Sequence, residues 1–143
     1  MTGYLLDTNV ISELRRIDRA NVNLVAWSHI TPIAQMYLSV VTVLEVEQGI
    51  LLLERKDARQ ALHIRTWLDN EILVNFKERI LEVDLKVAFA CAKLHVPDPR
   101  PERDALIAAT ALSNGLTVVS NNESDFAPMG IPFMNPWKSR AVS

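Results

Sequence analysis

The chain has 143 residues, of which 49% are hydrophobic and 22% charged, and its 15 Lys and Arg residues against 17 Asp and Glu residues give a net charge of −2. This composition is typical of a single globular domain that needs no disulfide or structural zinc to fold. The charge balance excludes a protein that holds nucleic acid through a general excess of basic residues, although it leaves room for a local basic patch.

Residue counts exclude several cofactor and redox sites. The four glycines are too dispersed for a dinucleotide- or nucleotide-binding loop, and the three histidines lack zinc-site spacing. We expect the single cysteine, Cys91, to be a buried apolar residue in a reducing compartment. The sequence has neither an apolar run of about 18 residues nor a basic-then-apolar leader, so we expect a cytoplasmic protein that does not enter a membrane.

The first half of the chain is predicted to alternate short apolar strands with helices. The first strand ends at Asp7, and Thr8 or Asn9 is expected to cap the next helix. A later helix is expected to begin at Thr42, which has the capping-box spacing T-x-x-E with Glu45. The predicted elements are strand 4–6, helix 9–14, helix 21–27, strand 36–41, helix 42–56 and helix 57–69.

The second half continues this alternation around a proline-rich loop. Prolines at 97, 99 and 101 exclude regular structure there, and Asn114-Gly115 ends the helix that follows. The predicted elements are strand 80–83, helix 84–95, helix 101–113, strand 116–120 and edge strand 131–134. The pattern predicts an α/β fold of one domain over residues 1–143, with helices on both faces of a parallel sheet.

Acidic residues follow the predicted strands, or begin the next helix, in four segments. Asp7 ends the first strand, Glu45 lies just after the second, and Asp104 is in the first turn of the helix after the proline loop. Asn122 and Asp125 follow the next-to-last strand. Ligands of parallel sheets bind beyond the carboxyl ends of the strands, so these segments are expected to converge at one edge of the sheet.

Each of these acids also has a purely structural interpretation. Asp7 can cap a helix, and Glu45 can complete a capping box with Thr42. Asp104 suits the positive end of a helix dipole, and Asp125 lies in a polar turn where such residues are common. The spacing alone therefore leaves both interpretations open.

Converging carboxylates suit a hard divalent cation, since Mg²⁺ and Mn²⁺ take carboxylate oxygens and waters as ligands. Such a cation can activate water and stabilise the charge that develops on a phosphodiester during hydrolysis. It also reverses the local sign of charge, so that a slightly acidic protein can bind RNA. Candidate phosphate contacts are Arg15, Arg16, Arg19, Arg100 and Arg103, with ordinary surface positions as the alternative.

Four short motifs, in order along the chain, resemble those of the PIN-domain family. They are residues 5–12 (LLDTNVIS), 39–45 (SVVTVLE), 104–111 (DALIAATA) and 121–126 (NNESDF). The closing residues 135–137 (NPW) are similar to the ending of the bacterial VapC- and FitB-like branch of that family. Each motif is short, but the four together, in register and in a chain of this length, are a specific signal.

The resemblance implies an α/β/α sandwich around a mainly parallel sheet and an endoribonuclease toxin, dependent on Mg²⁺ or Mn²⁺, that inhibits translation. By matching position, it makes Asp7, Glu45 and Asp104 the metal-binding catalytic acids, with Thr8 supporting the first. Many relatives have Asp where Asn122 stands, whereas others use an acid three residues later. We therefore expect Asp125 to be the fourth catalytic and metal-binding acid, with Asn122 in a supporting role.

The same resemblance implies partners. Relatives form homodimers and are silenced by a small VapB-like antitoxin that lies across the active-site groove, and operator DNA is bound through the antitoxin complex. Residues 50–53 and 67–68 are apolar helical segments that could supply dimer or antitoxin surface, with ordinary core as the alternative.

Two other hypotheses are kept. One is a PIN fold without catalytic activity that acts in antitoxin-dependent operator binding; Asn122 in place of an acid leaves room for it, while the four remaining acids oppose it. The other is an aspartyl-phosphate receiver or phosphohydrolase built on Asp7. Position 9 is Asn instead of the second acid of a D-x-D motif, and a receiver carries its phosphorylated Asp in mid-chain, so the sequence disfavours this hypothesis.

Overall fold

The computed structural model describes residues 3–138, so the first two and last five residues of the predicted domain lie outside it. Five strands form one sheet in the order β3-β2-β1-β4-β5, and every pair of neighbours is parallel. The strands are β1 (Tyr4–Leu6), β2 (Met36–Ser39), β3 (Ile80–Leu81), β4 (Thr117–Val119) and β5 (Phe133–Met134). The predicted parallel α/β sheet is confirmed.

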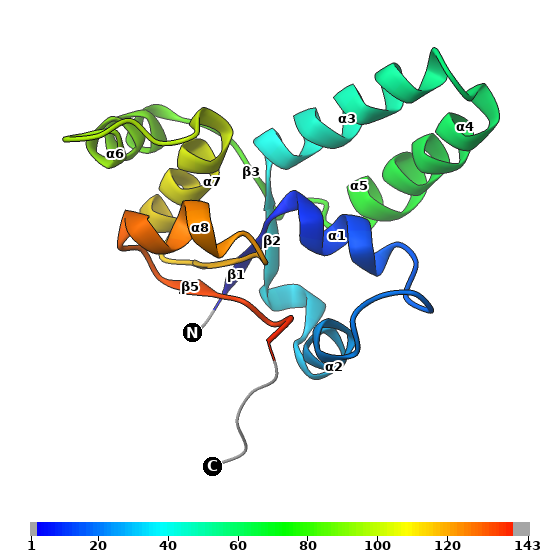
Figure 1. Cartoon of the computed structure of the whole chain (residues 1–143), viewed down its shortest axis with the longest axis horizontal. Helices are drawn as coiled ribbons and strands as arrows, with labels where there is room; N and C mark the ends of the chain where they lie inside the picture. Colours follow the sequence, from blue (N-terminus) through cyan, green and yellow to red (C-terminus); the bar gives the residue numbers. More distant parts are fainter. Residues whose placement is uncertain (1–2, 139–143) are drawn as a thin grey trace.

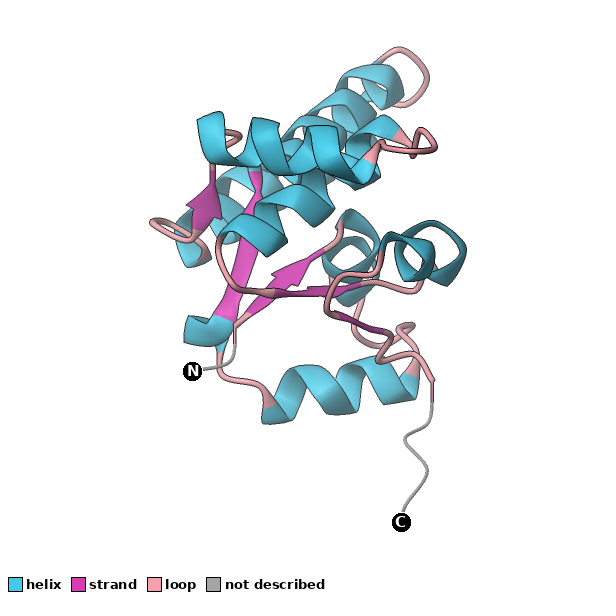
Figure 2. Ribbon diagram, turned by 90° about the vertical axis from the view of Figure 1, so that its left-hand side faces the viewer, coloured by secondary structure: helices cyan, strands magenta, loops and turns pink. Residues whose placement is uncertain are grey.

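Helices connect the strands and lie on both sides of the sheet (Figure 1; Figure 2). The helices are α1 (Thr8–Leu14), α2 (Val22–Ile30), α3 (Val40–Glu54), α4 (Ala58–Trp67), α5 (Leu73–Asn75), α6 (Leu85–Leu94), α7 (Glu102–Ser113) and α8 (Glu123–Phe126). Short helical turns at Ile33–Gln35, Leu68–Ile72 and Ala127–Met129 complete the described elements.

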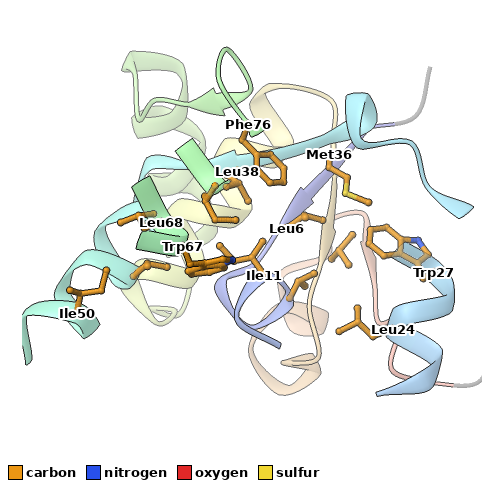
Figure 3. Close-up of a cluster of buried hydrophobic side chains, with 14 of the residues drawn as sticks. Leu6, Ile11, Leu24, Trp27, Met36, Leu38, Ile50, Trp67, Leu68 and Phe76 are labelled. Carbon is orange, nitrogen blue, oxygen red and sulfur yellow. The ribbon is translucent and has the colours of Figure 1, made fainter. Parts of the chain in front are cut away.

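Alternation along the central strands divides the core between the two faces of the sheet. Leu6 and Val119 point into a cluster with α1, α2 and α4, which includes Trp27 and Trp67 (Figure 3). Leu5 and Val118 point the other way, into a cluster with α6, α7 and α8. Successive side chains of a strand face opposite sides, so each strand of two or three apolar residues supplies both layers. The predicted α/β/α sandwich is confirmed.

Two predicted helix starts are wrong, and both lie at the edge where the acids are expected. Asp7 caps α1 instead of Thr8 or Asn9, because its carboxylate accepts from the Thr8 N–H; the structural interpretation given above for Asp7 is therefore confirmed. The second strand ends at Ser39, which caps α3 through the Val41 N–H. The predicted capping box is therefore absent, since Thr42 lies inside the helix and is fully buried.

Other boundaries differ where tertiary contacts extend or shorten an element. The helix predicted over 57–69, with an end that the sequence left open, continues through a π-helical turn and α5 to Asn75, because Leu68 and Ile72 belong to the core. The turn expected at 121–125 contains the short helix α8, which begins at Glu123. Strand 80–83 shrinks to two residues. Helix α7 ends at Ser113 as predicted, and Gly115 adopts a positive φ of 66° there.

The apolar segments considered for partner contacts fall into two groups. Ile50, Trp67 and Leu68 are buried in the core, which is the alternative that the sequence left open for them. Leu51 and Leu52 are exposed and remain available to a partner. Cys91 is buried, as expected. None of the helices within residues 3–138 combines the length and apolar character needed to span a bilayer.

The core assignment predicts a large difference between two identical substitutions. Leu6 is 1% exposed on the central strand, whereas Leu52 is 60% exposed on α3. We expect Leu6→Ala to lower the free energy of unfolding by about 2–5 kcal/mol, through lost burial and the cavity left behind. Leu52→Ala should change it by less than about 0.5 kcal/mol. Urea denaturation measures both, and equal effects would contradict the assignment.

Candidate active site

The site begins where the two central strands end side by side. Leu6 of β1 is opposite Val119 of β4, and the Asp7 N–H extends this pairing by donating to the Val119 carbonyl at 2.9 Å. The chain builds β2 and β3 on one side of β1 and then returns to place β4 and β5 on the other. Such a reversal of strand order leaves a crevice at the carboxyl ends, which is the usual ligand site of parallel sheets.

Asp7 is the most deeply placed acid of the site, with 6% of its surface exposed. Its Oδ1 accepts from the Thr8 N–H at 2.8 Å. Its Oδ2 accepts from the Ser120 hydroxyl at 2.8 Å and from the Asn9 amide at 3.3 Å. A buried carboxylate needs such donors, and both of its oxygens have them. Asp7 is thus held in one orientation at the floor of the site.

Glu45 comes from α3 and lies beside the first turn of α1. Its Oε1 accepts from the Thr8 hydroxyl at 2.6 Å, and its Oε2 lies 3.8 Å from Arg103 Nη1. Thr8 was expected to support the first acid; its backbone N–H contacts Asp7, whereas its side chain contacts Glu45. Thr8 therefore links two of the predicted acids.

Asn122 joins the two remaining acids. Its side-chain amide donates to Asp125 Oδ2 at 2.8 Å and lies 3.4 Å from Asp104 Oδ2. The backbone N–H of Asn122 donates to the Ser120 hydroxyl oxygen at 3.0 Å. Asp104 stands in the first turn of α7, and Asp125 is in α8. Asn122 and Asp125 therefore both lie in the site, next to Asp104.

One hydrogen-bonded network consequently connects all four predicted acids. It runs from Glu45 through Thr8 to Asp7, from Asp7 through Ser120 to Asn122, and from there to Asp104 and Asp125. The acids come from four separate segments, as expected from their positions after strands or, for Asp104, at a helix start.

Crowding of these carboxylates changes their acidity. Burial, followed by the adjacent Asp125 carboxyl group and the charges of Asp7, Asp125 and Glu45, raises the pKa of Asp104 to about 7. Burial also raises the pKa of Asp7, against the lowering effect of its hydrogen bonds from Ser120 and Thr8. Like charges held close together disfavour ionisation, so the cluster stores repulsion that a cation would relieve.

Sequence reasoning missed Ser120. This residue is fully buried, donates to Asp7, and accepts from the Asn9 amide at 3.1 Å and the Asn122 N–H. The sequence offered one signal for it. Ser120 is the last residue of the predicted strand 116–120, and the strand that pairs with it ends at Asp7. That signal requires knowing that β1 and β4 are adjacent, which the sequence order does not state.

The family model described as "PIN domain" matches residues 4–130, and the chain belongs to the PIN-domain family. It is similar to the toxin FitB of Neisseria gonorrhoeae, with 37% identity over 93% of this chain and 97% of that protein. It is also similar to the VapC ribonuclease Y4jK of Sinorhizobium fredii, with 33% identity over 94% of this chain and 97% of that protein. The sequence resemblance to the VapC- and FitB-like branch is thereby confirmed.

The solved structure of FitAB bound to the IR36 DNA fragment has the same fold. The TM-score is 0.85 with 32% identity, and the alignment covers 98% of this chain and 99% of that one. Nearly the whole architecture, and not the four motifs alone, is therefore shared.

The raised pKa of Asp104 predicts how the stability of the protein depends on pH in EDTA. Between about pH 4 and 7 the folded protein keeps a proton on Asp104 that the unfolded chain releases, so stability falls as pH rises through this window. Asp104→Asn should flatten this slope and be more stable than the wild type at pH 8. Thermal melts from pH 4 to 8 measure this, with the exposed Asp69→Asn as the control. A wild-type slope retained in Asp104→Asn would contradict the shift.

Proposed function

We propose that the protein is a divalent-metal-dependent endoribonuclease toxin that hydrolyses RNA phosphodiester bonds and thereby inhibits translation. The observation that carries this proposal is the network joining Asp7, Glu45, Asp104 and Asp125 at the carboxyl ends of β1 and β4. Similarity to a named VapC ribonuclease and to the toxin FitB supports the same reaction class. The proposed RNA substrate implies action in the cytoplasm.

The donor set fits Mg²⁺ or Mn²⁺. Carboxylate oxygens predominate, and burial together with the neighbouring carboxylates raises the pKa of Asp104, so a bound cation would stabilise the ionised acids. Within residues 3–138 no three His, Cys, Asp or Glu side chains stand close enough to share an ion directly. Mg²⁺ usually retains several waters, so we propose that Asp7, Glu45, Asp104 and Asp125 hold the cation in part through water.

Each residue of the site has a definable task. A divalent cation bound there supplies positive charge to the phosphodiester and makes water a better nucleophile. Asp7, fixed by Ser120 and Thr8, provides an anchoring carboxylate that cannot rotate away. Asp104, in the first turn of α7, provides a further carboxylate for the cation beside Asp125. Asn122 bridges Asp104 and Asp125 by donating toward both.

Cleavage of total cellular RNA by the purified protein tests the reaction. We expect discrete products with Mg²⁺ or Mn²⁺, none with EDTA, and a loss of roughly 1,000-fold or more in Asp7→Asn, the size of effect seen when one member of a catalytic group is removed. Asp69→Asn, an exposed change of the same type, serves as the control. Sequencing of the product ends would identify the target. Full activity of a folded Asp7→Asn protein would exclude the mechanism.

Ser120→Ala tests the proposed orientation of Asp7. The variant removes a hydrogen bond to a buried carboxylate, which is worth about 1.5–3 kcal/mol, so the cleavage rate should fall roughly 10- to 100-fold. We expect this loss in kcat and in metal affinity, with KM for RNA nearly unchanged. Ser113→Ala, at the opposite end of α7 from Asp104, is the matched control. A variant that folds and cleaves like the wild type would show that the Ser120 hydroxyl is not needed to orient Asp7.

We also propose a small VapB-like antitoxin as partner, a homodimer as the assembled form, and contact with operator DNA only through the antitoxin complex. The similar FitAB structure is bound to DNA, which supports such an assembly. An apolar cavity of about 250 Å³ between α1, α2 and the π-helical turn, lined by residues including Leu14, Ile33 and Trp67, is suited to an apolar side chain of a partner. Leu51 and Leu52 offer further apolar surface.

The two other hypotheses are weaker. Membership of the PIN-domain family disfavours an aspartyl-phosphate receiver. A catalytically silent PIN fold would gain nothing from four acids held in one network, one of them at a raised pKa. Tight antitoxin binding combined with no metal affinity in the free protein would nevertheless favour the silent form.

A further inference from the structure

Arg103 places a guanidinium beside the acid cluster, which consists of Asp7, Glu45, Asp104 and Asp125, but its contact with this cluster is weak. Its Nη1 lies 3.8 Å from Glu45 Oε2, and 44% of the Arg103 side chain and 27% of the Glu45 side chain are exposed. This separation exceeds that of a hydrogen bond. By contrast, Arg65 and Glu47 form a two-pronged pair in which Nη1 and Nη2 of the guanidinium each donate to one carboxylate oxygen. The Arg103 pair is therefore a loose one that a competing charge can replace.

Several other arginines of the described chain are engaged elsewhere. Arg100 donates to the backbone carbonyls of Leu94 and Pro128. Arg15 lies over the Trp67 ring, with its guanidinium carbon 5.9 Å from the ring centre. Arg79 donates to two backbone carbonyls and lies over Phe76. Among these candidates, Arg103 has its charge directed at an acid of the site.

The position of Arg103 on its helix also calls for a reason. It lies in the first turn of α7, where the helix dipole disfavours a positive charge. Its immediate neighbour Asp104 belongs to the site, so the backbone of α7 holds the guanidinium next to the acids. The Arg103 guanidinium thus lies at an unfavourable helix position, next to acids proposed to bind a metal. This location suits it to contact a negatively charged substrate.

We infer that Arg103 exchanges Glu45 for an RNA backbone phosphate when a divalent cation occupies the acid cluster. This inference rests on the proposed ribonuclease function and names a substrate-binding residue for it. A cation and a guanidinium compete for the charge of Glu45, so binding of the first frees the second. The planar guanidinium fork then matches two phosphate oxygens, which a lysine ammonium does not reproduce.

The exchange predicts that one substitution raises the affinity for the metal ion and lowers the rate of RNA cleavage. Arg103→Ala removes a competitor and should bind Mn²⁺ about two- to fivefold more tightly, the range expected for an exposed ion pair. The same variant should cleave RNA about tenfold more slowly at saturating Mg²⁺. Arg103→Lys keeps the charge without the fork, so its Mn²⁺ affinity should match the wild type while its cleavage stays slow.

Two measurements test the inference. Calorimetric titration with Mn²⁺ gives the metal affinity independently of activity. Fluorescence anisotropy with a labelled single-stranded RNA of mixed sequence, with Ca²⁺ replacing Mg²⁺, gives the RNA affinity and its salt dependence. Loss of one phosphate contact should reduce the slope of log affinity against log salt by about 0.7–1. Arg59→Ala on the exposed surface of α4 is the control of equal charge change.

The outcomes separate this inference from the proposed function. Tighter Mn²⁺ binding together with weaker RNA binding, in Arg103→Ala but not in Arg59→Ala, supports the exchange. Unchanged or weaker Mn²⁺ binding, or an unchanged salt slope for RNA, would overturn it. If the wild type cleaves no RNA, the proposed function fails, while the Mn²⁺ and RNA affinities of Arg103→Ala still decide the role of this residue.

Discussion

The hydrogen bond from the Ser120 hydroxyl to Asp7 Oδ2 joins the carboxyl ends of the two central strands. It exists because β1 and β4 pair in parallel with Leu6 opposite Val119, which places the next residue of each strand side by side. A carboxylate as buried as Asp7 would be costly without donors, and the fold supplies them from a neighbouring strand and from the first turn of α1. The rest of the site is arranged around this fixed group.

The acid cluster shows how function and stability oppose each other in this molecule. Four carboxylates held in one network repel one another, and this repulsion adds to burial in raising the pKa of Asp104. The apolar layers on the two faces of the sheet outweigh that repulsion, because they order the strands that carry the acids. The negative charge of these acids lowers the stability of the fold, but it also attracts a divalent cation and the Arg103 guanidinium. It therefore serves the proposed reaction.

Much of the site could be predicted from local sequence, and its connections could not. Asp7, Glu45, Asp104 and Asp125 stand after strands or at helix starts, so a parallel sheet brings them to one edge. The partners of Thr8 were harder to predict, because its side chain contacts Glu45 on a different helix, 37 positions along the chain. Asn122 and Asp125 seemed to be alternatives in the sequence, yet one turn of α8 lets both contribute.

The sequence by itself determined the α/β class, the parallel sheet and the four acidic segments, because apolar alternation and helix-stop residues such as Asn114-Gly115 act over a few neighbours. Only the tertiary structure decided that Ser39 and not Thr42 caps α3, that Trp67 and Leu68 are core, and that Ser120 orients Asp7. Those outcomes depend on which strands are adjacent and which face of a helix is covered. Both are set by packing between segments far apart in the sequence, which local sequence patterns do not specify.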